Sequence, residues 1–182
     1  DEVRVRLWEG WRVEQVADTL AAQSDLEFNR SEFLSSIAPG GLRPANFSFL
    51  ADLPSTASLE GFLFPDTYRF LPGTTTADVL TRFLLEFDTQ VTSQMRADAS
   101  TRGLTLYQVV ILASIVEREA VHDDERPTIA SVYLNRLNLS MKLEADPTTQ
   151  YAVAGPDDWW PLLNLDPRAV APPYNTYVYD GL

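Results

Sequence analysis

Glu117 is the residue whose place in the sequence best suits acid–base chemistry. It follows the almost uninterrupted apolar run of residues 109–116, and Arg118 and Glu119 come directly after it. Desolvation disfavours a charged carboxylate, so this run predicts a carboxylic acid that keeps its proton near neutral pH and acts as a general acid. A solvated charge at a helix end is the alternative that this segment alone leaves open.

Glu119 forms a Glu-x-Glu pair with Glu117, but helix geometry argues against joint action. Two positions along an α-helix correspond to a rotation of about 200°, which directs the two side chains to opposite sides. We therefore expect Glu119 to have a supporting role. Arg136, in the next predicted helix, is a candidate ion-pair partner for Glu119.

Two further segments gather side chains that suit a sugar ligand. Residues 144–151 place carboxylates, hydroxyls and an amide at a predicted helix start, where simple capping by Asp146 is the alternative interpretation. Residues 173–177 set the amide of Asn175 between two tyrosines, and residues 159–160 are two tryptophans. Aromatic faces beside hydrogen-bonding groups match saccharides, although such rings also serve as lids over a core.

Composition excludes several other classes of site and partner. The 182 residues include no cysteine and a single histidine, His122, which excludes disulfides, cysteine nucleophiles and His-rich zinc sites. A Ser-His-Asp triad would have to use His122, which lies in an acidic loop. The formal net charge of −12 makes nucleic acid and anionic lipid unlikely partners. No segment reaches the roughly 18 apolar residues of a membrane-spanning helix.

The elements that must position these residues are mainly helical. Residues 3–7 alternate as in a strand, and helical spacing follows over about 12–23 and 31–36, where Ser31 is the predicted cap. Further elements are expected as a loop at 42–60, an edge strand or structured turn around Pro65, helices at about 74–91, 105–117, 124–137 and 146–154, a short extended piece at 141–144, and an ordered loop to the end. The pattern predicts an α+β fold: a small βαα unit of residues 1–41, then a mainly helical domain with short strands, residues 42–182.

Four separated motifs carry a resemblance to a known family. They are IVERE at 115–119, ASVYLNRL at 130–137, MKLEADPT at 141–148 and YNTY at 174–177 followed by GL at 181–182. They resemble the YceG-like family of endolytic murein transglycosylases, and EGFLFPDTY at 60–68 resembles the approach to that family's catalytic domain. The first 20 residues are also similar to the family, so the resemblance covers nearly the whole chain, and several motifs in the right order are more specific than any one of them.

The resemblance implies an enzyme that cuts the β-1,4 bond between N-acetylmuramic acid and N-acetylglucosamine in nascent glycan strands, without water, and leaves a 1,6-anhydro-muramyl end. It implies that Glu117 is catalytic and that six further residues lie in or beside the site: Glu119, Arg136, Asp146, Thr148, Tyr174 and Asn175. One carboxylate then serves as acid and afterwards as base, so neither a second carboxylate at a fixed separation nor a metal or cofactor is expected.

The resemblance also implies how the chain relates to a longer protein. Family members begin with one membrane-spanning helix and a LysM-like region and continue beyond the motif that ends at residue 182. We therefore expect residues 1–41 to be LysM-like or linking and residues 42–182 to be a C-terminally truncated catalytic domain. The whole protein is expected in the cell membrane, with its catalytic domain outside the cytoplasm, beside the cell-wall synthesis machinery.

Two alternatives to the transglycosylase remain from the sequence. One is a glycan-binding or scaffolding module in which Glu117 is structural. The other is a hydrolase in which Asp146 acts as the base for a water molecule.

Overall fold

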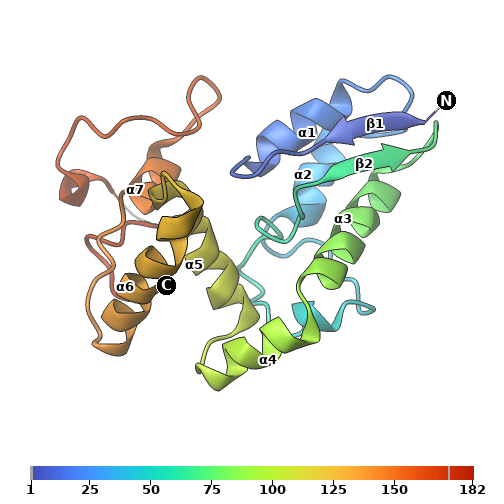
Figure 1. Ribbon diagram of the computed structural model, residues 1–182. Coiled ribbons are helices and arrows are strands. Elements are labelled where there is room, and N and C mark those ends of the chain that lie inside the picture. The colour runs from blue at the N-terminus through green and yellow to red at the C-terminus, as the bar shows by residue number, and fades with distance from the viewer. Residues whose placement is uncertain (1, 172) are drawn as a thin grey trace. The chain divides into compact units, whose positions relative to one another are not determined.

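The structure is a computed structural model that describes residues 2–171 and 173–182. Its fold is mainly helical with one two-stranded sheet (Figure 1), which confirms the predicted α+β class. The chain divides into two compact units, residues 1–107 and residues 108–182.

The sheet belongs to the first unit and pairs the start of the chain with a distant segment. Strand β1 (Val3–Arg6) lies antiparallel to β2 (Thr67–Phe70), with Val5 opposite Tyr68. Side chains alternate along both strands, so that apolar residues are buried on one face and arginines are exposed on the other. The predicted strand and the predicted edge strand after Pro65 are thus partners in one sheet.

Four helices and one short 3-10 turn complete the first unit. They are α1 (Val13–Ala21), α2 (Arg30–Ile37), η1 (Ser48–Leu50), α3 (Thr76–Gln90) and α4 (Ser93–Thr101). Fully buried Phe83 of α3 is the centre of an aromatic cluster. The centroid of its ring lies 4.6 Å from that of Tyr68 and 6.3 Å from those of Phe33 and Phe70. Aromatic burial of this kind makes a large contribution to core stability.

The helix starts of the first unit correct two expectations. Helix α2 is capped by Asn29, whose side-chain oxygen accepts from the Glu32 N–H at 2.9 Å, and the predicted cap Ser31 is wrong. Helix α4 has no counterpart in the predicted elements. It buries only Ala99, so its sequence carries no apolar period, and its start depends on a cap by Thr92.

The pairing of β1 with β2 bears on the predicted domain boundary after residue 41. Residues 1–41 supply β1, α1 and α2, but the strand that completes their sheet lies at residues 67–70. The contact-based division falls between Tyr107 and Gln108. A functional division at residues 41 and 42 stays a prediction.

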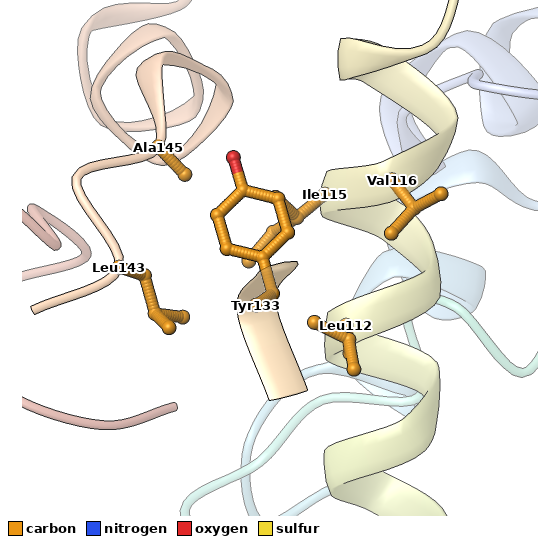
Figure 2. Close-up of a cluster of buried hydrophobic side chains, with 6 residues drawn as sticks. All are labelled: Leu112, Ile115, Val116, Tyr133, Leu143 and Ala145. Carbon is orange, nitrogen blue, oxygen red and sulfur yellow. The ribbon is translucent and has the colours of Figure 1, made fainter. Parts of the chain in front are cut away.

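The second unit is built on three α-helices and a long, mostly irregular tail. Its elements are α5 (Leu106–Glu119), which starts at the junction, η2 (Asp123–Glu125), α6 (Arg126–Asn138), α7 (Asp146–Val153) and η3 (Pro167–Ala169). Figure 2 shows its core, in which the Tyr133 ring lies between the side chains of α5 and those that precede α7. The core cluster consists of Leu112, Ile115, Val116, Tyr133, Leu143 and Ala145.

Helix α5 contains the apolar run but does not bury all of it. Ile115 and Val116 are buried, whereas Ala113 and Ser114 are exposed, and the helix continues past Glu117 to Glu119. Within the described residues, no single helix is long and apolar enough to cross a bilayer, and α4 and α5 reach that level only together, as a bent pair.

Candidate active site

A pocket of about 350 Å³ lies in the second unit and is lined by several charged and polar side chains that could bind or react with a ligand. Helices α5, α6 and α7, the segment before α7 and the tail all contribute to its wall. The wall consists of Glu119, Ile129, Val132, Tyr133, Arg136, Glu144, Asp146 and Tyr177. Three of the seven residues singled out from the sequence, Glu119, Arg136 and Asp146, therefore lie in one place.

Tyr133 connects the pocket to the hydrophobic core. Its ring is buried in the core cluster, and its hydroxyl donates to Glu119 Oε1 at 2.9 Å. Burial raises the pKa of Tyr133 far above its usual range, and the hydrogen bond to Glu119 raises it further, so the phenol stays a neutral donor. The expected ion pair between Glu119 and Arg136 is wrong: Glu119 is held by a tyrosine.

Arg136 holds the segment that precedes α7. Its guanidinium donates to the carbonyl oxygen of Leu143 and lies 3.7 Å from the carboxylate of Glu144, which Arg168 also approaches at 3.3 Å. Glu144 has a φ of 52°, so this end of residues 141–144 is not extended as predicted. A left-handed conformation is uncommon for a residue with a side chain, and two arginines on its carboxylate help to keep it there.

Asp146 is turned toward the pocket and does not cap α7. The N-cap is Ala145, and Asp146 is the first helical residue, where its charge still favours the helix N-terminus. Its Oδ1 accepts from the hydroxyl of Tyr177 at 2.7 Å, across 31 positions of sequence. Burial and this hydrogen bond raise the pKa of Tyr177 to about 12. Both tyrosines of the pocket thus donate to a carboxylate.

Thr148 fastens the start of α7 to the tail. Its hydroxyl donates to the carbonyl oxygen of Ala145 at 2.8 Å and lies 3.0 Å from the hydroxyl of Thr176. The Thr176 hydroxyl also accepts from the Ala145 N–H at 2.9 Å. Thr148 is therefore not part of the pocket wall but fixes the segment that leads to Asp146.

Asn175 is a structural clamp within the tail. It is fully buried, and its amide donates to the carbonyl oxygens of Pro167 and Val170, each at 2.7 Å. Its Oδ1 accepts from the Tyr177 N–H at 2.9 Å. Since both amide hydrogens are used, the side chain positions Tyr177 and has no donor left for a ligand.

Tyr174 lies outside the pocket wall and is half exposed. Its ring packs edge to face against that of Tyr151, with 5.0 Å between the ring centroids. Such an arrangement fixes an exposed aromatic face on the surface of the second unit.

Glu117 lies on another side of α5 from the pocket residue Glu119. Its Oε2 is 3.0 Å from a guanidinium nitrogen of Arg126, which also approaches Asp123 at 3.3 Å. The Glu117 side chain is 32% exposed, so the predicted apolar burial is wrong: the carboxylate is in an ion pair at the rim of the helix. The different partners of Glu117 and Glu119 agree with the rotation expected between them.

Arg118 ties the end of α5 to the tail. Its guanidinium lies over the ring of Trp160, 4.0 Å from the ring centroid. Burial lowers the pKa of Arg118, and the neighbouring charge of Glu117 acts in the opposite direction. The contact is a cation–π interaction of the type that recurs between arginine and tryptophan. It leaves Arg126 as the arginine that engages Glu117.

Sequence reasoning did not single out Arg126 as a residue of the site, and it placed Tyr133 only within the motif of residues 130–137. Glu144 and Tyr177 lie in the two segments considered for a sugar ligand, but their contacts were not predicted. The phenol–carboxylate pairs link positions that have no fixed spacing in the chain. In the part of the chain that the structure describes, no group of three or more His, Cys, Asp or Glu side chains is arranged to hold a metal ion.

Comparison with known proteins identifies the class to which this fold and site belong. The model of the YceG-like family matches residues 1–182, so the chain belongs to the YceG-like family. Among solved structures, a YceG-like protein of Listeria monocytogenes superposes with a TM-score of 0.78 at 25% identity, covering 100% of this chain and 61% of that one.

Curated relatives carry the name endolytic murein transglycosylase. One from Bacillus subtilis is 34% identical over 125 residues, which are 68% of this chain and 34% of the relative. One from Streptococcus pneumoniae is 34% identical over 94 residues, which are 52% of this chain and 17% of the relative. The chain thus spans about a third or less of the length of these relatives.

Proposed function

We propose that this chain carries the catalytic site of an endolytic murein transglycosylase, with Glu117 as the catalytic residue. Membership in the family and the name of the curated relatives support the reaction class. The observation that carries the assignment of Glu117 is its ion pair: Oε2 is held by Arg126, while Oε1 has no partner in the described part of the chain. A carboxylate held through one oxygen can exchange a proton through the other.

The proposed reaction breaks one C–O bond and forms another. Glu117, as the acid, gives its proton to the glycosidic oxygen between N-acetylmuramic acid and N-acetylglucosamine as the bond to the muramyl C1 breaks. The 2-acetamido group of the substrate stabilises the positive charge that develops at C1. Glu117, now ionised, takes the proton of the C6 hydroxyl while the oxygen of that hydroxyl bonds to C1. No water is consumed, and a 1,6-anhydro end remains.

The pocket is proposed to bind the glycan beside the reacting bond. Glu119 and Asp146 each use one carboxylate oxygen on a tyrosine. Their other oxygens have no protein partner in the described residues and can accept from sugar hydroxyl or amide hydrogens. Arg136 holds the segment of residues 143–144, which contributes Glu144 to the pocket wall. Thr148 and Asn175 support the pocket from behind, and Tyr174 is proposed as an aromatic face farther along the strand.

The setting of the reaction follows from its substrate. Peptidoglycan lies outside the cytoplasmic membrane, so we propose extracytoplasmic action on nascent glycan strands close to the cell-wall synthesis machinery. Anchoring of the whole protein by one membrane-spanning helix belongs to the same proposal, and nucleic acid is no part of it, given the net charge of −12.

The experiment is digestion of purified glycan strands by the full-length protein, with mass spectrometry of the new ends. Anhydro-muramyl ends are expected, and reducing ends would instead support a hydrolase. Uncut strands that still bind the protein would support a binding module.

Glu117→Gln is the decisive variant for the catalytic residue. Loss of a general acid lowers the rate by about 10²–10⁴-fold, and the fold should persist because the side chain is partly exposed. The matched control is Glu32→Gln on the exposed surface of α2, which should leave cleavage unchanged. Normal cleavage by Glu117→Gln would contradict the assignment.

A further inference from the structure

We propose that Arg126 is the positioning residue of Glu117 and that it assigns the transferable proton to Oε1. This inference rests on the function proposed above, because it concerns how the same carboxylate works. Its basis is the unequal surroundings of the two oxygens: Oε2 lies 3.0 Å from the Arg126 guanidinium, whereas Oε1 makes no hydrogen bond or ion pair within the described ranges.

The hydrogen-bonding groups of arginine decide which oxygen of Glu117 carries the proton. A guanidinium has five N–H donors and no acceptor. A hydrogen on Oε2 would therefore point at a group that cannot accept it. When Glu117 carries its proton, that proton lies on Oε1, and the oxygen that faces Arg126 remains an acceptor throughout the reaction.

Arg126 is itself held in place, which a positioning residue requires. It is the first residue of α6, and Pro127 follows it at a position where the fixed backbone angle of proline suits a helix start. Asp123, one turn earlier, takes a second contact of the same guanidinium nitrogen at 3.3 Å. The Arg126 Nε atom is buried and has no hydrogen-bond partner among the described residues. One terminal nitrogen of the guanidinium therefore lies between two carboxylates, those of Glu117 and Asp123.

The other charged groups near Glu117 do not compete for this role. Arg118, its neighbour on α5, stacks on Trp160. Glu125, which precedes α6, accepts from the backbone N–H groups of Val121 and His122 at 3.1 and 3.0 Å. Arg126 is thus the one cation that contacts the Glu117 carboxylate in the part of the chain described by the structure.

A purely structural ion pair makes a different prediction from a positioning residue. A surface ion pair affects stability slightly and leaves turnover alone. A residue that acts only by orienting the acid affects kcat and leaves KM nearly unchanged. The split between kcat and KM therefore separates the two roles.

The test compares Arg126→Gln and Arg126→Lys in the full-length protein, with purified glycan strands as substrate and anhydro-muramyl ends as the readout. Arg126→Gln is expected to lower kcat about tenfold or more with KM within about twofold, since small misplacements of a reacting group are costly. Arg126→Lys keeps a cationic donor and should recover part of kcat. Arg30→Gln, which breaks the exposed ion pair with Asp18 in the first unit, is the matched control and should behave as the wild type.

Two results would overturn the inference: an Arg126→Gln kcat within about twofold of the wild type, or no recovery with Arg126→Lys. The midpoint of thermal unfolding is measured for each variant, and kcat is expressed per folded molecule. If Glu117→Gln is inactive while Arg126→Gln is normal, the inference falls and the proposed function stands. If the wild type makes no anhydro ends, both fall.

Discussion

The two units of the chain are stabilised in different ways. The first unit buries a dense aromatic core around Phe83, together with the polar side chains of Arg12 and Thr76. The second unit has a small apolar cluster and buries polar side chains as well, among them Asn175, Thr149 and Thr176. Hydrogen bonds from Asn175 to the backbone carbonyl oxygens of Pro167 and Val170 help to hold its tail.

This difference indicates that the first unit serves mainly as a scaffold and that the second unit orients polar side chains. Apolar burial is nondirectional and stabilises a scaffold, whereas buried hydrogen bonds fix a side chain in one orientation. The carboxylates Glu117, Glu119 and Asp146 are each held through one oxygen, and all of them are in the second unit. Substitutions in the first unit should therefore change stability alone, whereas substitutions in the second unit can also change catalysis.

The largest effect is expected from Phe83→Ala in the first unit. Loss of a fully buried ring costs about 3–5 kcal/mol of unfolding free energy, because it leaves a cavity among its aromatic neighbours. Denaturant unfolding measured by circular dichroism checks the stability, and the cleavage rate per folded molecule should not change. Leu85→Ala, at an exposed position of the same helix, is the control. Equal losses in both variants would contradict a core centred on Phe83.

Asn175→Ala should have the next largest effect and act on the second unit. It leaves the carbonyl oxygens of Pro167 and Val170 without their donor, at a cost of about 1–3 kcal/mol. Hydrogen exchange followed by mass spectrometry should show faster exchange in residues 167–177 and little change in residues 67–87. Asn164→Ala, an exposed position of the same tail, is the control. Unchanged exchange in the tail would show that apolar contacts hold it instead.

Tyr133→Phe should separate the core role of the ring from the pocket role of its hydroxyl. The ring stays packed, while the hydrogen bond to Glu119 is lost, at a cost of about 1 kcal/mol. If Glu119 binds the glycan, KM should rise about fivefold at nearly constant kcat. Tyr179→Phe, with an exposed ring, is the comparison variant. A fall in kcat without a change in KM would place Glu119 in the chemical step.

The smallest effect concerns the alkaline titration of Tyr177. Its pKa is raised to about 12 in the folded chain, so folding favours its neutral form. The associated stability is fully present below the usual tyrosine pKa of about 10 and is lost as the pH rises through about 12. The ultraviolet absorbance of tyrosinate measures the titration. Asp146→Asn should lower the pKa of Tyr177, and an unchanged titration would mean that burial and the charges of Glu144 and Glu119 raise it without Asp146.

The predicted helices were mostly correct because their signals are local. The apolar period within residues 74–91 predicted α3, and the run at 109–116 predicted α5. The missing element, α4, has almost no buried face, so no periodic signal exists. The capping role of Asp146 was predicted wrongly, because Tyr177 withdraws the carboxylate into the pocket.

The site was only half predictable from the sequence. The motifs singled out Glu117, whose catalytic role stays a proposal, and helix rotation predicted that Glu117 and Glu119 have different surroundings, as the structure shows. The burial of Glu117 was predicted wrongly, because an apolar sequence before a residue does not reveal which face of its helix is covered. Arg126, which supplies the charge beside Glu117, lies on the next helix.

By itself, the sequence determined the α+β class, the positions of the main helices and the family, because periodicity, caps and ordered motifs are properties of short segments. Tertiary structure alone decided the partners: Tyr133 on Glu119, Tyr177 on Asp146 and Arg126 on Glu117. A hydrogen bond or ion pair needs two groups within about 3–4 Å. For residues on different elements, that distance is set by how the elements pack, and no spacing in the chain encodes it.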